Sequence, residues 1–127
     1  MGARKLWKEC SIIVHQLGYS IELVEDHDYR CYDEPPELWK QMKEDGVIAC
    51  AGTVLRESKL VLIRRSLTMR EKASVLAHEM AHLLLGGPNT WLKEDFVIDV
   101  EMSLCKEYGF TSPYYYDPNY DDPSGGK

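Results

Sequence analysis

The chain has 127 residues, 44% of them hydrophobic and 28% charged, which is typical of one globular domain built around a single core. Fifteen basic against 21 acidic side chains give a net charge of −6, which disfavours direct binding to the phosphate backbone of nucleic acids. No apolar run approaches the roughly 20 residues that span a membrane, and charges interrupt the N-terminus where a signal peptide needs an apolar core, so we expect a soluble, cytoplasmic protein.

The N-terminal part of the chain predicts a helix and then a strand. Apolar residues recur at helical spacing over 3–17, and Gly18 follows where a left-handed C-cap would end the helix. Residues 19–24 alternate apolar with polar, which is typical of a half-buried strand with Tyr19, Ile21 and Leu23 on one face. The acidic segment 25–36 ends in two prolines and is expected to be a surface loop.

The middle of the chain predicts a short helix and a hairpin. Residues 37–45 form the expected helix, which turns Leu38, Trp39 and Met42 inward and ends at Gly46. Two β-rich runs, 47–55 and 60–64, are separated by four polar residues, as in a β-hairpin. Gly52 interrupts the first run and is interpreted as a β-bulge.

Two long helices follow the hairpin. Thr68 and Glu71 have the spacing of a capping box, so the first helix is expected to begin near residue 69 and to end at the Gly-Gly-Pro sequence 86–88. The second is expected from about 91 to 108, with Asn89 or Thr90 as its N-cap and Gly109 as its stop. Residues 111–127, rich in tyrosine, proline and aspartate, are predicted to be an extended or disordered tail after a domain of residues 1–110.

The first long helix carries the sequence His78-Glu-Met-Ala-His82, the HExxH pattern of zinc hydrolases. The four-residue offset places both imidazoles on one face of the helix, one turn apart, where they can bind the same metal ion. Glu79 is then the candidate general base that takes a proton from water activated by the metal. Apolar neighbours on the helix favour this interpretation over two unrelated surface histidines.

The third zinc ligand has to come from another element, and the following helix offers candidates. Residues 94, 97, 98, 101, 104, 105 and 108 form one stripe, so Glu94 and Glu101 lie on its core-facing side. A carboxylate in that position needs a cation or hydrogen-bond donors. Glu94 is the preferred ligand, with Glu101 and then Asp95 or Asp99 as alternatives. Glu101 could instead bond the second nitrogen of a ligand histidine, or pair with an arginine or a lysine.

The other histidines and the cysteines are expected to have no metal role. His15 and His27 are interpreted as packing or surface residues. The four cysteines show no spacing typical of a zinc ribbon or finger, so we expect reduced, buried thiols. Those residues are Cys10, Cys31, Cys50 and Cys105.

The run Leu76-Ala-His-Glu-Met-Ala-His-Leu-Leu-Leu-Gly86, preceded by the hairpin, resembles the ImmA/IrrE-type metallopeptidases of bacteria, phages and mobile elements. Glu94-Asp-Phe-Val97 fits the family's next helix, and residues 94–109 also look like the metallopeptidase domain of ArdC-type antirestriction proteins. The likeness covers residues 47–109, about half the chain. Val97 and Glu101 stand where the family usually has alanines, so the packing of this helix is expected to differ.

The resemblance implies a gluzincin, in which His78, His82 and Glu94 hold Zn²⁺ and Glu79 is the base. It also implies a protein substrate, such as a transcriptional repressor of the same phage or mobile element. The predicted fold is a small zincin-like α+β domain, with a sheet of about three strands packed on the HExxH helix, the following ligand helix and the N-terminal helix. The predicted function is zinc-dependent endopeptidase. Two alternatives stay open, a metal-stabilised regulatory or binding protein without catalysis and a purely structural interaction domain.

Overall fold

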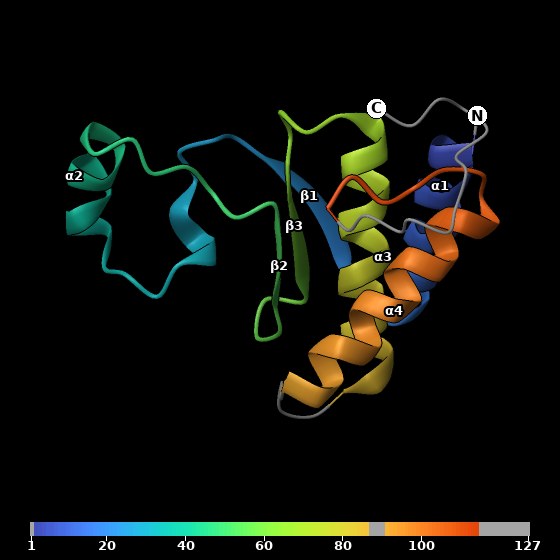
Figure 1. Cartoon of the computed structure of the whole chain (residues 1–127). Coiled ribbons are helices and arrows are strands. Elements are labelled where there is room, and N and C mark those ends of the chain that lie inside the picture. Colours follow the sequence, from blue (N-terminus) through green and yellow to red (C-terminus); the bar gives the residue numbers. More distant parts are fainter. Residues whose placement is uncertain (1, 87–90, 115–127) are drawn as a thin grey trace.

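The structure, a computed structural model, describes residues 2–86 and 91–114. These residues form a small α+β domain with four α-helices and a three-stranded mixed sheet (Figure 1). Two short 3-10 turns, η1 (Tyr29–Cys31) and η2 (Pro36–Leu38), precede α2. The remaining elements are, in order, α1 (Gly2–Gln16), β1 (Ser20–Val24), α2 (Trp39–Glu44), β2 (Gly52–Leu55), β3 (Leu60–Arg64), α3 (Met69–Leu85) and α4 (Trp91–Glu107).

The central strand of the sheet is β3, which explains its unbroken apolar sequence. It pairs parallel with β1, from Ser20 opposite Leu60 to Val24 opposite Arg64. On its other side it pairs antiparallel with β2, so the strand order is β1-β3-β2. A strand with neighbours on both sides and packing on both faces has to be apolar at successive positions, and Val61, Leu62 and Ile63 are all buried. Strands β1 and β2 are therefore the two edges of the sheet.

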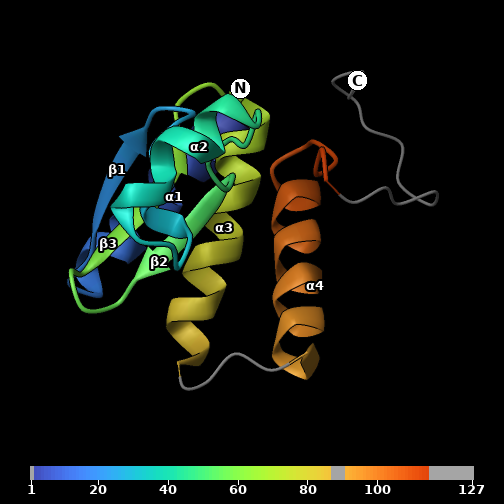
Figure 2. The same cartoon turned by 90° about the vertical axis from the view of Figure 1, so that its left-hand side faces the viewer.

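Helices cover one face of this sheet in two layers. Helices α1 and α3 pack against the strands, and α4 packs along α3 (Figures 1 and 2). The predicted stripe of α4 is confirmed, because Val97, Glu101 and Cys105 are all buried on the side facing α3. Residues from α1, β3, α3 and α4 share one hydrophobic core, which includes Leu6, Val14, Val61, Ile63, Leu76 and Cys105. Among the described residues, no helix combines the length and the apolar character needed to cross a membrane.

The ends of the long helices follow the local signals in the sequence. The capping box at the start of α3 is present, because the Thr68 hydroxyl accepts from the Glu71 backbone and the Glu71 carboxylate accepts from the Thr68 backbone. Helix α3 ends at Gly86, which has a φ of 64°. Helix α4 ends before Gly109, which has a φ of 87°, a conformation that glycine adopts without strain. The expected N-cap of α4, Asn89 or Thr90, lies outside the described residues.

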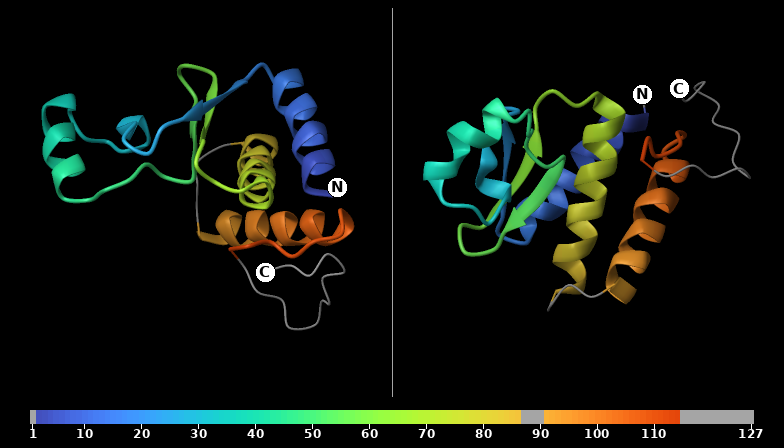
Figure 3. Two further views of the ribbon diagram at one scale, coloured as in Figure 1. Left: turned by 90° about the horizontal axis from the view of Figure 1, so that it is seen from above. Right: turned by 60° about the vertical axis from the view of Figure 1, so that its left-hand side comes forward.

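The segment between β1 and β2 differs from the predicted surface loop. It extends from the sheet on the side away from α3, with α2 at its far end (Figure 3). Its own small cluster forms around Tyr29, which is only 1% exposed and donates a hydrogen bond from its hydroxyl to the Val47 carbonyl. The Trp39 ring lies edge-on to Tyr29 at 6.0 Å. Leu38 does not turn inward but is 45% exposed, because the cluster takes up Trp39 instead.

The first hairpin strand is shorter than predicted. Strand β2 begins only at Gly52, because the backbone amides of Val47, Ala49 and Cys50 bond the preceding segment rather than β3. The Ala49 amide donates to the Asp26 carbonyl at 2.7 Å, and the Cys50 amide donates to the Cys31 sulfur at 3.1 Å. Pairing with β3 thus begins only where the chain leaves this segment, at Ala51, whose carbonyl accepts from the Arg64 amide at 2.9 Å.

Gly52 is not a bulge, since its pairing with Ile63 continues the regular register of the hairpin. The glycine instead allows β2 to approach α3 closely. A Cβ at this position would lie 2.2 Å from Val75 Cγ1 and 3.4 Å from Glu79 Oε2. The absence of a side chain therefore decides how near the strand comes to the helix that carries HExxH.

A Gly52→Ala substitution should lower the free energy of unfolding by about 1–3 kcal/mol, because it overpacks the contact between β2 and α3. Most of the clash is with one Val75 methyl group. The double variant with Val75→Ala should therefore recover part of the loss beyond the sum of the single effects. Urea unfolding of the four proteins measures this coupling. Additive effects would contradict the close approach at this glycine.

Candidate metal centre

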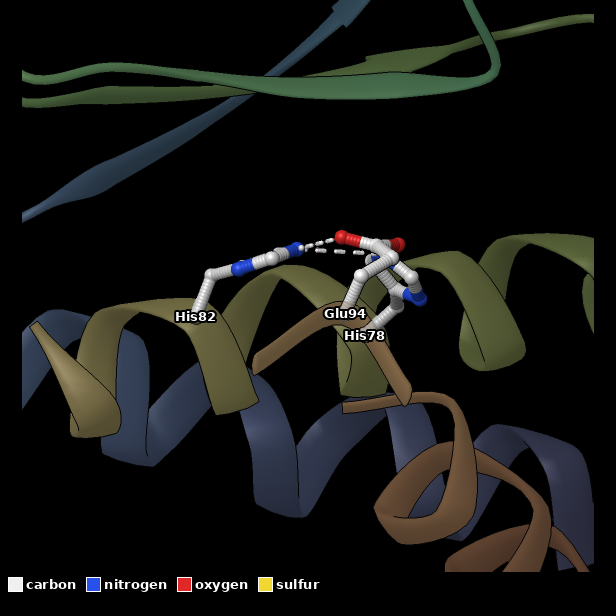
Figure 4. A group of neighbouring side chains, drawn as sticks. All are labelled: His78, His82 and Glu94. Atoms are coloured by element: carbon white, nitrogen blue, oxygen red, sulfur yellow. Dashed lines mark hydrogen bonds and ion pairs between the residues drawn. The ribbon is translucent and has the colours of Figure 1, made fainter. Parts of the chain in front are cut away.

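Helices α3 and α4 bring together three side chains that could hold a metal ion. His78 and His82 project from one face of α3, and Glu94 in the first turn of α4 points between them (Figure 4). Glu94 Oε1 lies 2.9 Å from His78 Nε2, and Glu94 Oε2 lies 3.0 Å from His82 Nε2. The two Nε2 atoms are 3.2 Å apart. A hydrogen bond connects the start of α4 with the end of α3, because the Lys93 ammonium donates to the Gly86 carbonyl at 2.8 Å.

These separations suit one small cation. Ligand atoms about 2.0–2.1 Å from zinc in a tetrahedral site are about 3.3 Å from each other. The three distances among the two imidazole nitrogens and the Glu94 oxygens, 2.9, 3.0 and 3.2 Å, come close to that value. In the described part of the chain, these three residues form the only group of at least three His, Cys, Asp or Glu side chains with ligand atoms close enough to share an ion. Two nitrogens and a carboxylate are also a donor set that zinc uses at catalytic sites.

The hydrogen bonds around His78 also favour a cation. Its Nδ1 lies 2.8 Å from Glu101 Oε1, and because a carboxylate only accepts, Nδ1 is the donor. The Nε2 of the neutral ring then carries a lone pair, which faces the Glu94 carboxylate, a second acceptor. Two acceptors at 2.9 Å need a proton or a metal ion between them.

Glu101 is itself held by two serines that the sequence did not single out. The hydroxyl groups of Ser74, on α3, and Ser112, beyond α4, both lie within hydrogen-bond distance of Glu101 Oε2, the latter at 3.0 Å. Because Glu101 is only 1% exposed, the two serines and His78 provide the hydrogen bonds that water would otherwise make to its carboxylate. It therefore bonds the second nitrogen of a candidate ligand, which was the alternative interpretation of this residue.

Glu79 lies beside the three candidate ligands on the side facing the sheet. Glu79 is only 9% exposed. The carboxylate borders a pocket of about 160 Å³ between α3 and β2, whose lining residues are Ala51, Gly52, Val75, His78, Glu79, Glu101 and Tyr114. A reacting group in this pocket would therefore meet Glu79 and His78 together. Tyr114 belongs to the predicted tail, of which residues 115–127 lie outside the described part.

The electrostatics of the site are those of crowded, buried titratable groups. Burial raises the pKa of Glu79 to about 7, and the charges of Glu94 and Glu101 add to this while His78 opposes it. Burial alone would lower the pKa of His78, but its hydrogen bond to Glu101 and the charges of the nearby glutamates outweigh burial and raise it. The pKa of His82 is lowered by burial and by the charge on His78. Such perturbed groups beside a pocket make this a candidate functional site.

The other candidates from the sequence lie elsewhere. Asp95 and Asp99 are exposed on α4 and do not join the histidines. His15 is exposed on α1, and His27 is exposed with its Nδ1 3.0 Å from the Tyr29 hydroxyl. All four cysteines are free, as expected, but only Cys10 and Cys105 are buried.

Comparison of the chain with models of known families, with curated proteins and with solved structures finds no match.

Proposed function

We propose that this protein is a zinc-dependent endopeptidase with a zincin-like active site of the gluzincin type. The observation that carries the proposal is the convergence of His78, His82 and Glu94, of which His78 borders the same pocket as the buried carboxylate of Glu79. A purely structural zinc site is usually closed by four protein ligands. Here three ligands and an adjacent buried acid line up with the requirements of metal-assisted hydrolysis.

In this proposal His78 Nε2, His82 Nε2 and one or both Glu94 oxygens hold the ion. Bound zinc supplies a Lewis acid that polarises the scissile carbonyl and lowers the pKa of water. The chain's own contribution begins with orientation, since Glu101 fixes the tautomer of His78 through the bond at Nδ1. The rest of the pocket wall includes Ala51, Gly52 and Val75, with Val75 buried beside Gly52.

Glu79 is the proposed general base. Its carboxylate borders the pocket next to His78, a position from which a side chain can take a proton from water in the pocket and return it. It would accept the proton from the attacking water and pass it to the amine that leaves when the peptide bond breaks. The same side chain thus serves as base and then as acid.

The proposed substrate is an extended peptide segment that pairs with the edge strand β2. The Arg64 amide bonds the Ala51 carbonyl, so alternation along the antiparallel ladder turns the backbone groups of Gly52 and Val54 away from β3. These groups lie on the free edge next to the pocket that Gly52 lines. An added strand would gain main-chain hydrogen bonds there and would carry its peptide bonds past Glu79.

A Val54→Pro substitution should reduce peptide cleavage at least tenfold, because it removes the outward amide that would bond an added strand. Proline is tolerated on an edge strand when its nitrogen faces outward, so the sheet and zinc content should persist. The matched control is Val54→Ala, which trims the side chain but keeps the amide. Steady-state cleavage of a quenched fluorescent peptide library compares them. Equal rates for the two variants would exclude pairing at this edge.

The resemblance to ImmA/IrrE-type metallopeptidases supports a transcriptional repressor or regulator of a phage or mobile element as the protein substrate. The experiment is co-expression of the chain with repressors from such elements, followed by mass spectrometry of their fragments. We expect a discrete cut that disappears with Glu79→Gln. A regulatory effect that survives in that variant would favour a metal-stabilised binding protein without catalysis.

A further inference from the structure

Three buried polar side chains from separate parts of the chain meet behind His78. Ser74 lies one turn before His78 on α3, Glu101 lies on α4, and Ser112 lies in the segment after α4. Their residues are 0%, 1% and 4% exposed. The two serine oxygens are 2.6 Å apart, and both contact Glu101 Oε2. Burying three polar groups at the junction of two helices is costly unless they satisfy one another.

Each serine hydroxyl carries one hydrogen, which it donates either to Glu101 Oε2 or to the other serine. In every such arrangement at least one hydroxyl group donates to Oε2, and the imidazole of His78 donates to Oε1. The Ser112 oxygen also accepts from the Tyr114 amide at 3.3 Å, so its hydrogen is free to point at the carboxylate. With Oε2 engaged by the serines, Oε1 is directed at His78.

We propose that Ser74 and Ser112 are positioning residues of the metal site, acting on His78 through Glu101. This role rests on the proposed zinc site and adds the residues that hold the hydrogen-bond partner of a zinc ligand. The terminal torsion of a glutamate is broad, so a carboxylate held at one oxygen alone could turn away. The linked hydroxyl groups of Ser74 and Ser112, which both contact Oε2, remove that freedom. His78 then presents Nε2 to the ion in a fixed direction, as an outer partner does at metal sites.

Ser112 carries the more informative part of this role, because it comes from the segment after α4. That segment turns back toward α3 (Figure 1), where Ser112 meets Ser74. Tyr114, two residues later, lines the same pocket as His78 and Glu79. Residues 112–114, assigned by sequence to the tail, therefore contribute both a contact to Glu101, through Ser112, and a lining residue of the pocket, Tyr114.

The test is a double-mutant cycle for zinc affinity, measured in the full chain by competition with a chromogenic chelator. Glu101→Gln should weaken zinc binding about 10- to 100-fold, as loss of an outer-shell partner does. Ser112→Ala should weaken it by a smaller factor, on the order of threefold to tenfold. In the Glu101→Gln background, Ser112→Ala should have no further effect, because its route to the metal is already lost. The same loss in both backgrounds would overturn the role and leave a packing effect.

Further variants keep the test decisive. Ser103→Ala, an exposed serine on α4, should leave the zinc affinity unchanged. Ser112→Thr keeps the hydroxyl and should bind zinc like the unaltered chain, which decides the question should Glu101→Gln fail to fold. Full zinc affinity in Ser112→Ala would overturn this role while leaving the proposed peptidase intact. An unaltered chain that binds no zinc would overturn the metal site itself and this role with it.

Discussion

Glu79→Gln should retain one zinc per chain and lose cleavage by about 10²- to 10⁴-fold, the range that a general base contributes. The amide has nearly the shape of the carboxylate but cannot accept and return a proton. Glu79 is not among the three candidate ligands, so the ion should stay bound. The measurement pairs zinc content by atomic spectroscopy with cleavage rates on a peptide library.

The matched control for this substitution is Glu107→Gln, which makes the same change on the exposed side of α4 and should leave cleavage unaltered. Removing the buried Glu79 carboxylate, whose pKa is raised by burial, should also leave the fold at least as stable in chelator. Undiminished cleavage by Glu79→Gln would exclude its role as the base. Loss of zinc together with cleavage would instead make it a ligand.

His82→Ala should lose stoichiometric zinc, because it leaves the ion with one imidazole and one carboxylate. His78→Ala should do the same. Protein purified without chelator should contain about one zinc per chain, and free zinc at a thousandfold excess over its dissociation constant should stabilise the fold by about 4 kcal/mol. Both variants should lose this increment, measured as the difference in unfolding free energy with zinc and with EDTA.

His15→Ala is the matched control, since His15 is exposed on α1 and outside the metal group. It should bind zinc and respond to EDTA like the unaltered chain. Unaltered protein with no stoichiometric zinc would overturn the proposed metal centre. Equal stability with and without EDTA would favour a purely structural interaction domain.

The features that could be predicted are those with local causes. Helical spacing and Gly18 determined α1, and the capping box at Thr68 determined where α3 begins. The four-residue offset of the two histidines follows from the geometry of one helix. The buried stripe of α4, with Glu94 and Glu101 on one side, follows from the same periodicity. These elements hold in the structure because their signals lie within a few residues of one another.

What the sequence left open depends on contacts between distant segments. Only the packed structure shows that the lack of a side chain at Gly52 lets β2 approach Val75 on α3. It also shows that Tyr29 is buried and that β2 is an edge strand. Glu94 was preferred from the sequence, and the arrangement of α3 and α4 brings it to both histidines while Glu101 turns to the other nitrogen of His78.

Nothing near Ser112 in the sequence marks it as a partner of the site, because a single serine has no pattern and Glu101 is 11 residues away. By itself, then, the sequence determined the pair of histidines and the acid between them, since one helical turn is enough to align them. The tertiary structure decided which carboxylate completes the group and which hydroxyls hold it, since those positions depend on how two helices and the segment after them pack together.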